Sequence, residues 1–85
     1  MEKYRLEIKR SALKEIERLP KRELKSILEK IASLADDPRP HGYEKLSGEE
    51  KYRIRCGDYR ILYGIEDKIL VVYIVKVGHR RDVYR

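Results

Sequence analysis

Apolar and polar positions follow two different periods along the chain, and the change of period predicts where helices give way to strands. In residues 3–9 every second side chain is apolar, the pattern of a half-buried strand. Residues 12–19 and 21–35 carry apolar side chains three and four positions apart, which predicts two amphipathic helices. Beyond residue 50 the period of two returns and predicts three strands, over residues 51–56, 59–65 and 69–77.

Single residues set the expected helix boundaries. Ser11 is expected to cap the first helix, which would then begin at Ala12. Pro20 is expected to end this helix and to begin the next, because proline is tolerated only in a first helical turn. The second helix carries the clearest apolar stripe, which we expect to cover a sheet: Leu24, Ile27, Leu28, Ile31 and Leu34. Residues 36–42 contain two prolines and a glycine that end this helix, and residues 43–50 form a connector.

The order of these elements indicates an α+β fold. A single domain spanning residues 1–85 would run β-α-α-β-β-β, with an antiparallel sheet and two N-terminal helices packed on one face. The last strand, residues 69–77, is apolar on both faces. The pattern therefore leaves open which face of this strand meets the helices.

The stretch YRIRCGDYR, residues 52–60, predicts a hairpin with the two-residue turn Gly57-Asp58. In this register Arg55 lies directly opposite Arg60. The side chains toward the helices would be Tyr52, Ile54, Cys56, Tyr59, Ile61 and Tyr63, and those on the other face Lys51, Arg53, Arg55 and Arg60. Like charges so placed destabilise a sheet by a few tenths to ~1 kcal/mol, which favours an anion site over a merely solvated face.

Composition supports an anionic partner. The net charge of +6 favours nucleic acid, a ribosome, an acidic protein or an anionic membrane surface. One cysteine excludes an intrachain disulfide, and no apolar run approaches a membrane span, so we expect a cytoplasmic protein. The two histidines, His41 and His79, lie far apart in sequence, so neither a metal nor another cofactor is expected.

The C-terminal tail adds further cations beside the hairpin. If the last strand pairs with its neighbour, Gly78 lies near the Gly57-Asp58 turn, and the tail that follows approaches Arg55 and Arg60. Cations with a histidine and a tyrosine bind RNA through phosphate contacts and base stacking. The residues concerned are His79, Arg80, Arg81, Asp82, Tyr84 and Arg85.

The stretch YRIRCGDYRILYGIEDKILVVYIVKVGHRRDVYR, together with KLSGEEKYRIR before it, resembles the RelE/ParE toxin superfamily, and its RelE branch in particular. The resemblance implies a toxin that enters the ribosomal A site and cuts mRNA there without a metal. A ribose 2′-hydroxyl would attack the adjacent phosphate, leaving a cyclic phosphate and a 5′-hydroxyl. Such chemistry needs a base, an acid and cations for the phosphorane.

The resemblance also implies roles for single residues. Arg53 and Arg55 match the two basic positions of the family's Tyr-basic-Ile-basic strand, Arg60 and Arg80 would stabilise the phosphate, and Tyr84 would stack on a base. Well-known RelE proteins have lysines at both strand positions, and a guanidinium essentially cannot give up its proton. The base would therefore come from elsewhere: His79, Asp82, Lys51 or a ribosomal group. Further RNA contacts are expected from Lys51, Arg81 and Arg85.

The implied partners are a RelB-like antitoxin, the 70S ribosome with its mRNA, and operator DNA reached through the antitoxin complex, with no membrane. The antitoxin is expected to be an acidic or amphipathic segment that covers basic surface. Two other functions stay open from the sequence. One is a ParE-like toxin that inhibits DNA gyrase by binding. The other is a catalytically weak toxin that binds its antitoxin and helps the complex hold its operator.

Overall fold

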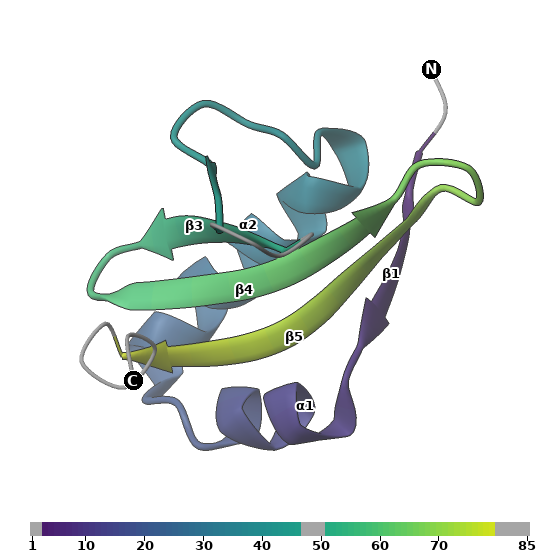
Figure 1. Ribbon diagram of the computed structural model, residues 1–85. Coiled ribbons are helices and arrows are strands. Elements are labelled where there is room, and N and C mark those ends of the chain that lie inside the picture. The colour runs from purple at the N-terminus through teal and green to yellow at the C-terminus, as the bar shows by residue number, and fades with distance from the viewer. Residues whose placement is uncertain (1–2, 47–50, 80–85) are drawn as a thin grey trace.

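Two helices and five strands make up the computed structural model, which describes residues 3–46 and 51–79. In chain order the elements are β1 (Arg5–Ile8), α1 (Arg10–Glu17), α2 (Lys21–Asp36), β2 (Glu44–Lys45), β3 (Tyr52–Cys56), β4 (Tyr59–Glu66) and β5 (Val71–His79). The strands form one sheet in the order β1-β5-β4-β3-β2. Figure 1 shows α2 behind β3 and β4, and α1 below β5.

The predicted α+β fold is confirmed, and one detail of the sheet is corrected. The pairs β2–β3, β3–β4 and β4–β5 are antiparallel, whereas β1 pairs with β5 in parallel. The sheet is therefore mixed rather than wholly antiparallel. Parallel neighbours need a crossover between them, and everything from α1 to β4 supplies it. Within its described residues, 43–46, the connector contributes the short edge strand β2.

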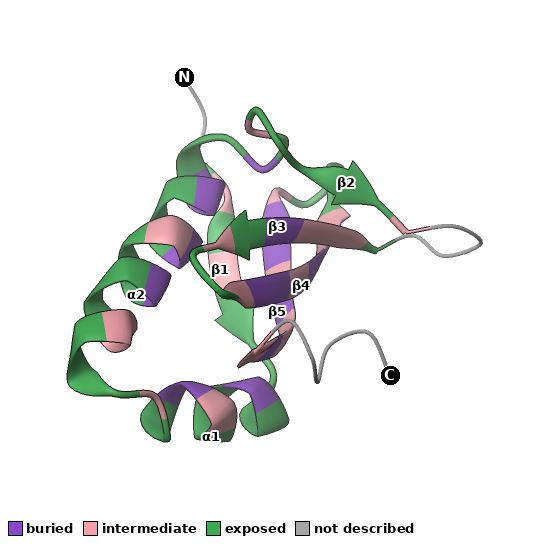
Figure 2. Ribbon diagram, turned by 90° about the vertical axis from the view of Figure 1, so that its left-hand side faces the viewer, coloured by how far each residue is buried: buried purple, intermediate pink, exposed green. Residues whose placement is uncertain are grey.

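The hydrophobic core lies between the two helices and one face of the sheet. Figure 2 shows the buried residues of α1 and α2 on the sides that face the strands. Ala12 and Ile16 of α1 are buried at the predicted helical spacing, and Leu19 packs against them. From the sheet, Ile54, Ile61 and Tyr63 are buried, as the alternation predicted. The remaining buried members of this cluster are Ile27, Ile31, Leu34, Val72, Ile74 and Val77.

Three expectations about the helices are wrong in whole or in part. Helix α1 begins at Arg10, so Ser11 lies inside its first turn, and the N-cap position is Lys9 without a side-chain cap. The reason is that the Lys9 amide donates to Ile74 O of β5 at 2.9 Å, which turns the chain into the helix directly after the strand. Leu28 is 45% exposed because it lies at the edge of the α2 stripe. Pro20 stands directly before α2 as its N-cap, as expected, but it does not end α1, which already ends at Glu17.

The structure shows which of the two apolar faces of β5 packs against the helices. The β4–β5 turn spans residues 67–70 rather than the three residues expected, and a bulge interrupts the pairing between Leu62 and Tyr63. Leu62 pairs with Lys76 but Tyr63 pairs with Ile74, so Val75 is the extra residue. The bulge allows Val72, Ile74 and Val77 to reach the core although their spacing is not a strict period of two.

Candidate functional site

The open face is the face of the sheet that points away from the helices. The register of β3, β4 and β5 arranges its side chains in rows about 7 Å apart along the strands. One row joins Arg55, Arg60 and Gly78, and the next joins Arg53, Leu62 and Lys76. Continuing the register by one residue places Lys51 opposite Gly64, which pairs with Tyr73. The predicted strand register and the shared face of Arg53, Arg55 and Arg60 are therefore confirmed.

Arg55 and Arg60 lie directly opposite each other, as the sequence predicted. Arg55 is exposed, and no ion pair is formed by it within the described part of the chain. Arg60 is only 5% exposed, and its NH1 donates to Tyr59 O at 3.3 Å. Arginine is almost never buried unless its charge is compensated, and a facing arginine adds to the cost. The exposed guanidinium in this row is therefore that of Arg55, which lies opposite the buried Arg60.

Arg53 has an acidic partner within the sheet. Its NH2 group lies 3.2 Å from Oε2 of Glu44 on β2, and the Arg53 side chain is largely buried. Glu44 also pairs with Arg53 in the β2–β3 register, so the short edge strand delivers this carboxylate. Arg53 is therefore partly neutralised, whereas the row of Arg55 and Arg60 receives no such carboxylate from β2.

His79 follows Gly78, the residue of β5 that pairs with Arg60, and its side chain therefore lies on the opposite face of the sheet from that of Arg60. It pairs with Tyr59, whose side chain packs on the core, and the two rings meet edge to face with centroids 5.6 Å apart. Lys51 lies on the open face, four residues and roughly 13 Å of strand from Arg55. Neither of these two candidate bases therefore lies in the row of Arg55 and Arg60.

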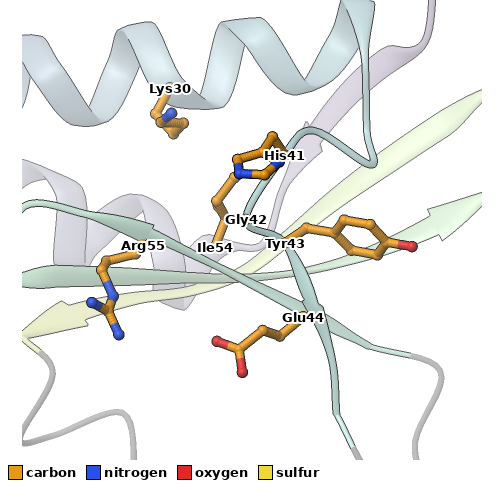
Figure 3. A pocket seen from close by; sticks show the side chains of 7 residues that line it. All are labelled: Lys30, His41, Gly42, Tyr43, Glu44, Ile54 and Arg55. Carbon is orange, nitrogen blue, oxygen red and sulfur yellow. The ribbon is translucent and has the colours of Figure 1, made fainter.

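A hollow of about 450 Å³ lies beside β3, next to the loop residues that precede β2. Its lining includes Lys30 of α2 and His41 of the following loop, together with Arg55 and Glu44. Figure 3 shows Lys30 and His41 on one side of the β3 ribbon, and Arg55 and Glu44 extending on the other. Sequence reasoning missed that Lys30 and His41 lie beside Arg55, because only the packing of α2 against β3 brings them together.

A charged cluster with one arginine, Arg39, lies at the far end of β4. Arg39 binds Asp67 with two hydrogen bonds, of 3.2 and 2.9 Å, and the hydroxyl of Tyr4 donates to the same carboxylate at 2.6 Å. The Arg39 guanidinium also lies 5.6 Å from the centre of the Tyr52 ring. The hydrogen bond from Arg39, followed by that from Tyr4, lowers the pKa of Asp67 to about 2. All the charges of this cluster are thus balanced internally.

Several classes of site find no support in the described residues. Residues 3–46 and 51–79 contain no group of three or more His, Cys, Asp or Glu side chains that could hold a metal ion. Within the same ranges, no helix is long and apolar enough to span a membrane. Cys56 lies on the helix side, where its Sγ is 3.6 Å from Ser26 O, and burial raises the pKa of its thiol.

Several expected site residues lie outside the part of the chain that the structure describes. They are Arg80, Arg81, Asp82, Tyr84 and Arg85. The residue before them, His79, pairs with Tyr59 next to the Gly57-Asp58 turn, as expected. The roles of these five residues stay predictions.

Comparison with known proteins identifies the family. A sequence profile described as "ParE toxin of type II toxin-antitoxin system, parDE" matches residues 6–84. The chain belongs to the RelE/ParE toxin superfamily. Among its relatives, a putative toxin RelE1 of Methanocaldococcus jannaschii is 32% identical, covering 98% of this chain and 97% of its own length. Toxin RelG of Mycobacterium tuberculosis is 33% identical, with 96% and 97% covered.

Solved toxin structures share the fold. The toxin–antitoxin complex RelBE2 of Mycobacterium tuberculosis matches with a TM-score of 0.84 at 30% identity, covering 94% of each chain. An archaeal RelE–RelB complex from Pyrococcus horikoshii matches with a TM-score of 0.82 at 33% identity, over 92% of this chain and 96% of that one. Isolated RelE toxin of Escherichia coli gives 0.79 at 30% identity, over 95% and 90%. The chain is thus a RelE-type toxin by both sequence and fold.

Proposed function

We propose that this toxin cleaves mRNA in the ribosomal A site without a metal ion and so inhibits translation. The observation that carries the proposal is the pair of facing arginines on the open face, Arg55 and Arg60, with Arg60 buried. A bound phosphate would pair with the exposed Arg55 and reduce its repulsion from Arg60, and a developing phosphorane carries more negative charge than the phosphate it comes from. The pair would therefore favour the transition state over the bound substrate.

The reaction proposed is attack of the 2′-oxygen on the adjacent phosphorus. The bond between phosphorus and the 5′-oxygen breaks, which leaves a 2′,3′-cyclic phosphate and a 5′-hydroxyl. The 2′-hydroxyl proton passes to a base, and an acid protonates the leaving 5′-oxygen. Arg55 and Arg60 would hold the phosphate in line, with Arg80 as a further cation and Tyr84 stacked on a base.

We also propose a smaller set of candidates for the base. Arginine does not act as a base at neutral pH, which removes Arg53 and Arg55 from this role. His79 lies on the helix side of the sheet and Lys51 lies two rows away from Arg55. We therefore assign the base to Asp82 or to a ribosomal group in preference to these two residues. Replacing Asp82 with Asn separates the two, because only the first assignment predicts a loss of cleavage.

Antitoxin binding is proposed from the relatives. The toxins of Mycobacterium tuberculosis and Pyrococcus horikoshii were each solved in a complex with an antitoxin. An acidic segment of a RelB-like antitoxin would neutralise the open face and block access to mRNA. Operator DNA would be reached through this complex.

The deciding experiment uses ribosomes programmed with a defined codon in the A site. Antitoxin-free toxin is added, and primer extension maps the cut. We expect cleavage within the A-site codon, and no cleavage when a 2′-deoxynucleotide replaces the nucleotide whose hydroxyl attacks. Intact mRNA after exposure to folded toxin would rule out the proposal, and cleavage of the deoxy-substituted message would rule out the 2′-hydroxyl mechanism.

The description of the matching family profile favours one other candidate. Its ParE name makes inhibition of DNA gyrase by binding the second function to test. A supercoiling assay with purified gyrase distinguishes the two. Loss of supercoiling, together with uncut mRNA on programmed ribosomes, would replace the first proposal with the second.

A further inference from the structure

Two neighbouring hollows lie over β5 on the open face, with volumes of about 380 and 270 Å³. Both are lined by Lys9, Lys51 and Val75, so the two hollows adjoin, and we describe them together as one groove. Tyr73 lines the first hollow, and Leu62 and Lys76 line the second. We call this feature the lysine groove, and its residues are Lys9, Lys51, Leu62, Tyr73, Val75 and Lys76.

The shape of the groove follows from two features of the strands. Gly64 stands between Lys51 and Tyr73 in their row, and because it has no side chain, both neighbours can line the same hollow. The bulge in β5 adds Val75 to the floor beside Leu62. The floor is therefore apolar and aromatic, although it lies on the face of the sheet opposite to α1 and α2.

The charges around the groove are mainly unbalanced cations. The acidic side chains in its walls are already engaged: Glu7 pairs with Arg5 at 2.9 Å, and Glu15 pairs with Lys76 at 3.7 Å. Glu15 also accepts the Val77 amide at 2.9 Å. Lys9 and Lys51 are exposed, and neither has an ion-pair partner among residues 3–46 and 51–79. The groove thus offers two available ammonium groups above an apolar floor.

We propose that the lysine groove binds the nucleotides of single-stranded RNA that flank the cleaved phosphate. Lys9 and Lys51 would contact phosphates, and a base would stack on Tyr73, the combination that binds single strands without sequence preference. The groove lies one and two rows from Arg60 on the same face, so one RNA strand can occupy both. The inference rests on the proposed function and extends its substrate site to Lys9 and Tyr73, to which the family resemblance gave no role.

The test measures binding away from the ribosome. The probe is a short, fluorescently labelled 2′-O-methyl RNA, which cannot be cut because its 2′-oxygen is blocked. The affinity of antitoxin-free toxin is measured by anisotropy over a range of salt concentrations. The charge variant is Lys9→Ala/Lys51→Ala. Its matched control is Lys21→Ala/Lys25→Ala, which removes two exposed lysines from α2, on the helix side of the sheet.

Two results are expected. In the charge variant the slope of log affinity against log salt becomes shallower by about 1.4, since each phosphate contact on a single strand contributes about 0.7. The control keeps the slope of the wild type. Tyr73→Leu loses roughly five- to a hundredfold in affinity because the stacking ring is gone, and Tyr73→Phe restores it.

Two outcomes would overturn the inference: no RNA binding by the wild type, or a charge variant that binds RNA with the affinity and salt dependence of the control. Cleavage on programmed ribosomes, measured in parallel, separates this inference from the proposed function. Ribosomal cleavage by the wild type without groove-dependent RNA binding refutes the groove alone. Groove-dependent binding without ribosomal cleavage refutes the proposed nuclease and leaves the groove as an RNA site.

Discussion

Two charged groups lie at opposite ends of β4: the row of Arg55 and Arg60, and the cluster around Arg39. They are built in opposite ways. Beyond the last residue of this strand, Asp67 receives two hydrogen bonds from Arg39 and one from Tyr4. At its beginning, Arg60 faces Arg55, and no ion pair of Arg55 exists within the described ranges. The comparison teaches that an arginine held by an internal carboxylate serves the fold, whereas an exposed arginine such as Arg55, with no ion pair among the described residues, leaves charge available for a ligand.

The largest expected effect is on the cleavage rate, and it is tested by replacing one arginine at each end of β4 with lysine. Arg60→Lys keeps the charge but removes the planar fork that holds a phosphate with two bonds, and we expect ribosomal cleavage to fall by about a hundred- to a thousandfold. Arg39→Lys should leave the cleavage rate within about twofold, since its partner is Asp67. Circular dichroism and urea unfolding verify that both variants are folded. Equal losses in the two variants would remove the distinction between the clusters.

The next effect concerns stability at the Arg39 end. Tyr63 is fully buried, and its hydroxyl donates to Pro38 O at 2.7 Å, which holds the loop that carries Arg39. Tyr63→Phe leaves this carbonyl without its partner, so we expect a loss of about 1–2 kcal/mol in the free energy of unfolding. Urea unfolding measures the loss, and the folded variant should cleave mRNA at the wild-type rate. A variant as stable as wild type would show that this bond does not hold the loop.

A smaller effect of opposite sign is expected at Arg55. Arg55→Thr removes the repulsion from Arg60, so the protein should gain up to ~1 kcal/mol of stability while its cleavage rate falls. The control is Lys45→Thr on β2, because Lys45 pairs with the uncharged Tyr52 and its removal relieves no such repulsion. If Arg55→Thr is less stable than wild type, the two arginines do not repel one another in the free protein.

The smallest effect is the acid dependence of the Arg39 end. The folded-state pKa of Asp67 is lowered from 3.8 to about 2, so its contribution to stability is fully present above about pH 4 and is lost as the pH falls through 2. The melting temperature of wild type should exceed that of Asp67→Asn by a constant few degrees above pH 4. This difference should shrink between pH 4 and pH 2. A difference independent of pH would assign the effect to packing.

The sequence predicts one of these clusters well and the other poorly. The Gly57-Asp58 turn fixes the register by itself, because a two-residue loop permits one pairing, so the opposition of Arg55 and Arg60 could be derived from nine residues. Arg39, Asp67 and Tyr4 come from three segments separated by 28 and 63 residues, and only the folded sheet brings them together. Local patterns predict local pairings, and contacts across the sheet need the whole topology.

Three other features of the structure were not predicted from the sequence, and they too depend on the topology of the whole sheet. The parallel pairing of β1 was missed because alternation shows that a residue is in a strand but not its direction. The lysine groove was missed because the bulge at Val75 and the glycine at position 64 create it jointly. The burial of Arg60 was also not predicted, because alternation gives the face of a side chain but not what surrounds it there.

The central claim is that Arg55 and Arg60, at the beginning of β4, act on RNA and that Arg39, beside the end of β4, does not. The most direct test compares the cleavage rates of wild type, Arg60→Lys and Arg39→Lys on the same programmed ribosomes. We predict A-site cleavage by wild type and Arg39→Lys at similar rates, and a rate at least a hundredfold lower for Arg60→Lys. A wild-type rate in folded Arg60→Lys would contradict the account.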